Sequence, residues 1–105
     1  MLTDSKKERR DAVRKPTEMR GTLESDRGSR MAVDIVDLST GGFSAELGNN
    51  AVLDSTGFEV NLGGLEPLGA ELRWAGRTDA GFRFQRPLHP AVFDHLIERN
   101  KPRSG

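Results

Sequence analysis

Apolar and polar residues alternate along most of the chain with a period of two. The alternation is clearest at residues 31–36, 58–62, 68–74 and 82–85. Such a pattern is typical of strands that bury one face. Two further short strands are predicted at 19–25 and 43–47, and turn signals, most of them rich in glycine, separate the six segments. Trp74 ends the alternating series Leu68, Ala70, Leu72, so we predict that its side chain points into the core.

The last element differs, and residues 89–100 are predicted to form a helix. Pro90 stands where the first turn of a helix tolerates proline. Val92, Phe93, Leu96 and Ile97 then form one apolar stripe at helical spacing. Six short strands and a terminal helix predict an all-β fold, a small six-stranded antiparallel barrel with the helix packed over one opening. A barrel of this kind leaves no strand edge unpaired.

The composition fits one soluble domain with a modest core. Of the 105 residues, 34% are hydrophobic and 30% are charged, and no apolar run is long enough to span a membrane. Residues 1–10 lack the apolar stretch of a secretory signal. Cysteine is absent, which excludes disulfides, thiolate nucleophiles and cysteine-based zinc sites. We therefore expect a cytoplasmic protein without membrane contact.

Basic residues concentrate near the N-terminus, although the chain carries no formal net charge. Residues 6–15 hold six basic and two acidic side chains. We predict that residues 1–16 form a flexible arm, that 17–99 form the barrel with its helix, and that 100–105 are frayed. The charge run is either a solvated tail or an arm that binds anions. The zero net charge argues against a protein that coats long nucleic acid.

Enzymatic chemistry finds little support in these residues. His89 and His95 are the two histidines, and their separation of six residues does not place two side chains on one helix face. The nucleophile elbow G-x-S-x-G does not occur. We predict a protein without catalytic activity, metal or cofactor.

The stretch DLSTGG, at residues 37–42, combines two glycines, two hydroxyls and a carboxylate. A hairpin turn alone would account for glycine, aspartate and serine here, because each suits tight backbone geometry. The alternative is that the turn also binds a ligand.

Arg10 and Arg14 lie four residues apart in the arm and would fall on roughly the same side of the chain. Two guanidinium groups at this spacing could grip one compact dianion, because arginine meets phosphate oxygens bidentately. Arginine also matches the O6 and N7 acceptors of guanine. The same spacing recurs at 73/77 and 99/103, which we interpret as solvated surface.

Taken together, RRDAVR at 9–14 and DLSTGG at 37–42 resemble the signature of the PilZ domain family, R-x-x-x-R followed by D/N-x-S-x-x-G. The segment LGAELRWAGRTDAGFRF at 68–84 also resembles the closing strand pair of that family. The resemblance covers residues 8–99. It implies a receptor for the bacterial second messenger cyclic di-GMP, with the ligand on the outer surface of a six-stranded barrel and wrapped by the N-terminal arm.

The resemblance also implies roles for individual residues. The arginines would meet phosphates and guanine edges, the aspartate would accept from guanine N–H groups, the serine would add a hydroxyl contact, and glycine would allow close approach. The implied ligand-binding residues are Arg9, Arg10, Arg14, Asp37, Ser39, Gly41 and Gly42. In this family an arginine at the place of Arg9 goes with binding of a stacked ligand dimer, so two ligands per chain are expected.

We therefore predict a sensor in which ligand orders the arm and so alters the surface that a downstream protein binds. One alternative is a protein-interaction module of the same fold that acts without ligand. A small nucleic-acid-binding barrel is less favoured, because aromatic residues make up 6% of the chain and tyrosine is absent.

Overall fold

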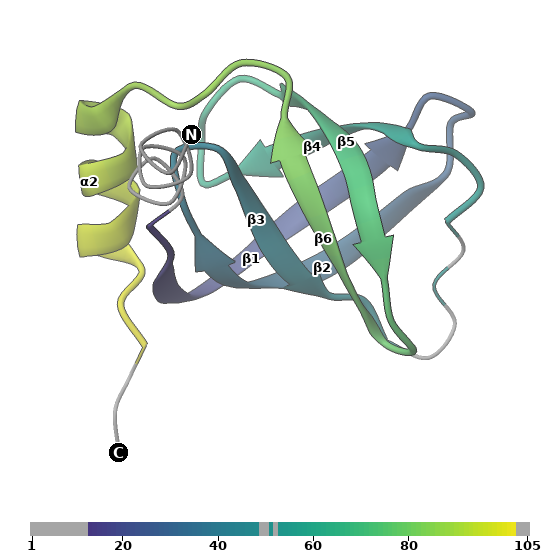
Figure 1. Ribbon diagram of the computed structural model, residues 1–105, viewed down its shortest axis with the longest axis horizontal. Helices are drawn as coiled ribbons and strands as arrows, with labels where there is room; N and C mark the ends of the chain where they lie inside the picture. Colours follow the sequence, from purple (N-terminus) through teal and green to yellow (C-terminus); the bar gives the residue numbers. More distant parts are fainter. Residues whose placement is uncertain (1–12, 49–50, 52, 103–105) are drawn as a thin grey trace, which may run out of the picture.

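In the computed structural model, which describes residues 13–48, 51 and 53–102, six strands close into an antiparallel barrel (Figure 1). The strands lie side by side in the order β1-β2-β3-β6-β5-β4, and β4 closes the barrel against β1. Their bounds are β1 Lys15–Ser25, β2 Arg30–Leu38, β3 Gly42–Glu46, β4 Gly57–Leu62, β5 Leu68–Ala75 and β6 Asp79–Phe84. The predicted six-stranded antiparallel barrel with a C-terminal helix is confirmed.

The first strand begins at Lys15, two residues before the barrel start that we expected at 17. Of the predicted arm, residues 13–16 are described and exposed, and Lys15 and Pro16 already belong to β1 and pair with β2. Residues 1–12, which include Arg9 and Arg10, lie outside the described residues. The flexibility of the arm therefore stays a prediction.

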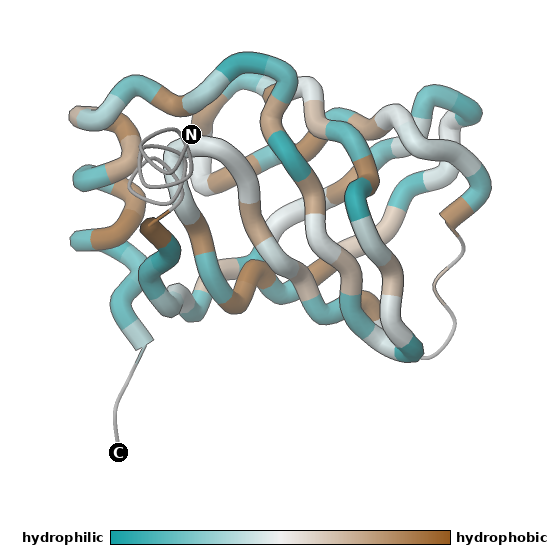
Figure 2. Tube along the Cα trace, viewed as in Figure 1, coloured by the Kyte–Doolittle hydropathy of each residue, from teal (hydrophilic) through white to brown (hydrophobic). Residues whose placement is uncertain are grey.

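The core fills the inside of the barrel with the apolar half of each alternating strand, and hydropathy alternates along the strands accordingly (Figure 2). Phenylalanine dominates the centre. The rings of Phe43 and Phe82 stack with centroids 5.0 Å apart, and Phe58 meets Phe82 edge-on at 5.3 Å. Such ring pairs add to the stabilisation that burial of their area provides. The smaller Ala45, Ala70 and Ala80 make room for the rings and are fully buried.

Helix α2, Pro90–Arg99, stands at one end of the barrel (Figure 1) and adds Phe93 and Leu96 to the core. Its start is capped by His89, whose Nδ1 accepts a hydrogen bond of 3.0 Å from the Ala91 amide. This histidine therefore satisfies one of the free amides that open every helix. At the other end, the carbonyl of Asn100 accepts from the Glu18 amide at 2.8 Å, which ties the helix to β1. Among the described residues, no helix has both the length and the apolar character that a membrane crossing requires.

At one end of the barrel, side-chain hydrogen bonds join the β1–β2 turn to the segment that precedes β4. Ser29 Oγ donates to Asp54 Oδ2 at 2.7 Å, and Ser55 Oγ donates to Asp26 Oδ1. The hydrogen bond from Ser29 is the main cause that lowers the pKa of Asp54, and burial opposes it.

A pH-dependent stability follows from the lowered pKa of Asp54. A carboxyl whose folded-state pKa lies below its unfolded value stabilises the fold above the unfolded pKa, and this stabilisation is lost as the pH falls through the folded pKa. We expect Asp54→Asn to be less stable than the wild type at pH 7. The difference should shrink as the pH falls below the ordinary pKa of an aspartate. Thermal unfolding of both proteins from pH 7 to pH 2.5 measures this, and a constant difference over that range would contradict the assignment.

Candidate nucleotide-binding site

Asp37 reaches the outer surface because β2 contains a β-bulge. Ile35 lies opposite Ala45, but Asp37 lies opposite Ser44, so β2 uses one residue more than β3 over this stretch. Side chains alternate along a strand, and an unbroken β2 would therefore place Asp37 on the inner face with Val33 and Ile35. The extra residue reverses the alternation and turns the carboxylate outward.

Arg14 lies beside Asp37 because β1 pairs with β2 as far as Lys15, which is opposite Leu38. The Nη1 atom of Arg14 donates to Asp37 Oδ1 at 2.6 Å. The side chains are 44% and 29% exposed, so the ion pair is screened by water and adds little to stability. What it provides is a guanidinium fork and a carboxylate held next to each other on the surface.

Ser39 holds the turn at 38–42 together from inside. It is 2% exposed, and its Oγ accepts hydrogen bonds from the amides of Gly41 and Gly42, both at 3.1 Å. The same hydroxyl donates to the carbonyl of Gly42 at 3.3 Å. These contacts use both roles of the hydroxyl, so Ser39 shapes the turn. Its direct contact with a ligand stays a prediction.

Position 42 must be glycine because β6 lies too close for a side chain there. A Cβ built on Gly42 would lie 2.1 Å from the carbonyl oxygen of Phe82 on β6, where no side chain fits. We predicted that this glycine allows close approach of a ligand, which stays a prediction. The structure shows a second reason for glycine here, the close approach of β3 and β6. At Gly41 a Cβ would meet nothing nearer than Ser39 Oγ at 3.9 Å.

Trp74 is not in the core, and this prediction was wrong. A second β-bulge lies in β5, where Leu72 is opposite Phe82 but Trp74 is opposite Gly81. The extra residue between them, Arg73, reverses the alternation, so Trp74 leaves the inner face that Leu72 occupies. Its side chain is 45% exposed.

A hollow of about 630 Å³ joins these features on the outer face of the barrel. Its lining includes three arginines, Arg14, Arg73 and Arg83, of which the first directly precedes β1 and the others lie on β5 and β6. Trp74 and residues 39, 41 and 42 of the turn also line this hollow. We call this site the arginine hollow. Its volume falls within the range of ordinary small-molecule sites, about 300–1,000 Å³.

The carbonyls of the turn connect the arginine hollow to the segment that leads into α2. The Phe84 amide donates to the carbonyl of Gly41, and the Leu88 amide donates to the carbonyl of Thr40, each at 2.8 Å. Pro87 in the same segment also lines the hollow. A displacement of the turn would therefore also displace residues 84 and 88, which precede α2.

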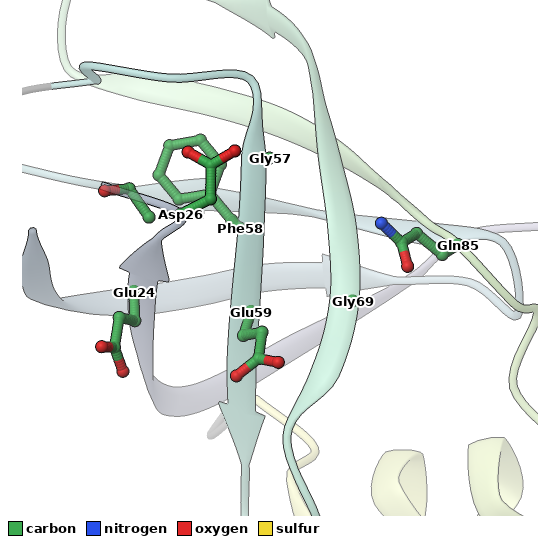
Figure 3. A pocket seen from close by; sticks show the side chains of 8 residues that line it. Glu24, Asp26, Gly57, Phe58, Glu59, Gly69 and Gln85 are labelled. Atoms are coloured by element: carbon green, nitrogen blue, oxygen red, sulfur yellow. The ribbon is translucent and has the colours of Figure 1, made fainter. Parts of the chain in front are cut away.

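A second hollow on the barrel surface has the opposite charge (Figure 3). Glu24 of β1 and Glu59 of β4 are cross-strand neighbours in it, and Asp26 adds a third carboxylate. This arrangement repels a phosphate. Within residues 13–48, 51 and 53–102, no group of three or more His, Asp or Glu side chains is arranged to hold a metal ion.

Among solved structures, two examples resemble this chain over most of its length. The PilZ domain of CeSA from a cellulose-synthesizing bacterium is 21% identical, with a TM-score of 0.56 over 84% of this chain and 93% of that chain. YcgR from Escherichia coli, solved in complex with c-di-GMP, is 25% identical, with a TM-score of 0.56 over 87% of this chain. This chain folds as a PilZ domain. No family model and no curated protein sequence matches it.

With this fold, the chain spans nearly all of the CeSA domain but 44% of the YcgR chain, so it corresponds in length to one part of the latter protein. The PilZ signature residues that are described gather at one place, with Arg14 and Asp37 in contact and Ser39, Gly41 and Gly42 in the adjoining turn. Sequence reasoning missed Arg73, Trp74 and Arg83 as residues of this site.

Proposed function

We propose that this PilZ domain is a non-catalytic receptor for cyclic di-GMP, which binds in the arginine hollow. The observation that carries the proposal is the convergence of three guanidinium groups, one exposed indole and a polar turn on a single hollow. A cyclic dinucleotide offers two phosphates and two planar bases, which match these groups. The solved complex of YcgR with c-di-GMP supports the choice of this ligand among nucleotides.

The Arg14–Asp37 pair is suited to read a guanine. Arg14 carries five donors, which match the O6 and N7 acceptors of guanine or the oxygens of a phosphate. Asp37 can accept from the N1–H and N2–H₂ donors of the same kind of base. These groups face each other at 2.6 Å, so both are positioned on the surface that the ligand approaches.

Trp74 provides a face on which a base can stack. Stacking of a base on an aromatic side chain contributes about 1–3 kcal/mol, and Trp74 is the exposed aromatic ring of the arginine hollow. Arg73 and Arg83 lie around it and bring positive charge toward the phosphates. Arg73 also makes a long ion pair of 3.9 Å with Glu71, which leaves most of its donors for a ligand.

The arm at 1–16 closes over the bound nucleotide in this proposal. Arg14 lies at the described end of the arm, and Arg10 and Arg9 precede it in the sequence. Arg10 contacts the ligand together with Arg14, and Arg9 admits a second, stacked ligand, so two ligands per chain are predicted. Closure changes the surface around the turn and α2, and a downstream protein reads that change. The cytoplasmic location stays a prediction.

Isothermal titration with cyclic di-GMP tests the receptor function and its stoichiometry together. We expect saturable binding, with two ligands per chain, that weakens as salt rises, because the contacts are largely ionic. Cyclic di-AMP is the matched control ligand, because adenine lacks the O6 acceptor and the N2 amino group that Arg14 and Asp37 read. Absence of heat with cyclic di-GMP, or equal binding of both nucleotides, would reject the proposal and leave the ligand-independent interaction module.

A further inference from the structure

We propose that Gly81 is a positioning residue for ligand binding, because it leaves the space in which the indole of Trp74 lies. The expected effect of Gly81 on ligand affinity rests on the proposed function, whereas its effect on the position of the Trp74 ring does not. Gly81 lies directly opposite Trp74 in the β5–β6 ladder, on the outer face of the barrel.

The indole occupies the volume that a side chain at 81 would need. A Cβ built on Gly81 would lie 2.0 Å from Nε1, 2.4 Å from Cε2 and 2.7 Å from Cδ1 of Trp74. Carbon atoms in contact sit about 3.5–4.0 Å apart, so the five-membered ring crosses the place of the missing side chain. Gly81 faces outward yet is buried, because the ring covers it.

The orientation of Trp74 follows from two features that act together. The bulge at Arg73 turns Trp74 to the outer face, and the absence of a side chain at Gly81 lets its ring lie against β6 rather than stand away from it. The ring remains 45% exposed and lines the arginine hollow. A flat ring that is fixed on one side and open on the other is the arrangement that base stacking needs.

An alanine at 81 should move the indole rather than the strand. Gly81 pairs with Ser44 of β3 on one side and with Trp74 of β5 on the other, so its backbone is held in two ladders. The side chain of Trp74 has no such restraint on its exposed side. Gly81→Ala should therefore remove the stacking part of binding and leave the ionic part, which depends on Arg14 and its neighbours.

A double-mutant cycle of Gly81→Ala and Trp74→Ala tests this by titration with cyclic di-GMP. We expect each single variant to bind about tenfold or more weakly, the loss that removal of one base–aromatic stack produces. In the Trp74→Ala background, Gly81→Ala should cause no further loss, because the ring through which it acts is gone. Equal losses in both backgrounds would overturn the proposal.

Fluorescence of the ligand-free proteins gives a readout that does not need binding. Trp74 is the single tryptophan of the chain, so its emission reports on this ring alone. We expect Gly81→Ala to shift the emission maximum, whereas Gly57→Ala, at an outward position of β4 where a Cβ meets Asp26 at 2.9 Å, should not. An unchanged spectrum for Gly81→Ala overturns the positioning role. A shifted spectrum in a protein that binds no nucleotide would instead reject the receptor function alone.

Loss of folding in Gly81→Ala would also test whether a side chain at 81 conflicts with the indole of Trp74. If that variant is unfolded by circular dichroism but the double variant with Trp74→Ala folds, the conflict lies with the indole, as proposed. If neither folds, the backbone itself requires glycine at 81, and the proposal is overturned.

Discussion

Arg14→Ala should weaken binding of cyclic di-GMP by about 10- to 100-fold, the loss that follows from removing hydrogen bonds to a charged group worth about 1.5–3 kcal/mol. Arg14 is the signature arginine that the structure places, in contact with Asp37 and in the wall of the arginine hollow. Its removal takes away one positive charge and all five donors of the fork. The salt dependence of the remaining binding should also be shallower. Calorimetric titration at two salt concentrations measures both effects.

The stability of the Arg14→Ala protein should change by less than about 1 kcal/mol, because exposed ion pairs contribute little. Arg20→Ala is the matched control. Arg20 lies on β1, the strand that follows Arg14, and pairs with Asp34 at 3.3 Å, but it does not line the arginine hollow. Binding by Arg20→Ala should match the wild type. If both variants lose affinity equally, the effect is one of overall charge, and Arg14 has no specific role.

Arg14→Lys separates charge from geometry at the same position. Lysine keeps the positive charge but lacks the planar fork that meets a phosphate or a guanine edge with two hydrogen bonds. We expect Arg14→Lys to remain closer in affinity to Arg14→Ala than to the wild type. Full recovery would mean that Arg14 acts through its charge alone and reads no base.

The alternation of apolar residues was enough to predict the barrel, because each strand buries one face and alternation reports burial directly. The segments at 58–62 and 43–47 are examples, since Val60, Phe43 and Ala45 point inward as expected. Helix α2 was predictable for a similar reason. Phe93 and Leu96 of its apolar stripe are buried, and Val92 and Ile97 pack against the core from the edge.

The site was predictable only in part, because β-bulges break the alternation without leaving a clear mark in the sequence. The signature motif led to Asp37, although a strict alternation with Val33 and Ile35 would have placed it inside. Trp74 belongs to no such motif, so the alternation alone placed it in the core. One extra residue at Arg73 moved it from the predicted core to the wall of the arginine hollow. Glycine at 81, across the hairpin from Trp74, is the sequence feature that agrees with an outward ring.

The roles of Ser39 and Gly42 show a second kind of limit. The sequence identified both residues, but their main contacts are with the protein itself. The turn beside the arginine hollow needs an internal hydroxyl acceptor and a strand without a side chain at 42. A motif can therefore mark a binding site through residues that build the loop as well as through residues that touch the ligand.

Gly42→Ala tests this distinction, and we expect it to be strongly destabilising without any ligand. The new Cβ would stand 2.1 Å from the Phe82 carbonyl oxygen, which is backbone and cannot rotate away. The strands β3 and β6 must then separate at the pair Gly42–Arg83. Overpacking of this kind costs about 1–3 kcal/mol and occasionally more. For a domain of this size the melting temperature should fall by roughly 5–20 °C.

Gly41→Ala is the neighbouring control for this prediction. Its Cβ would meet only Ser39 Oγ at 3.9 Å, and Gly41 does not have a positive φ, so stability should change by less than about 0.5 kcal/mol. Thermal unfolding of both variants without nucleotide decides between the two explanations of Gly42. If Gly42→Ala melts like the wild type and loses only ligand affinity, the glycine serves ligand approach, as the motif alone suggested. If its melting temperature falls while Gly41→Ala melts normally, contact between β3 and β6 is the reason that position 42 must be glycine.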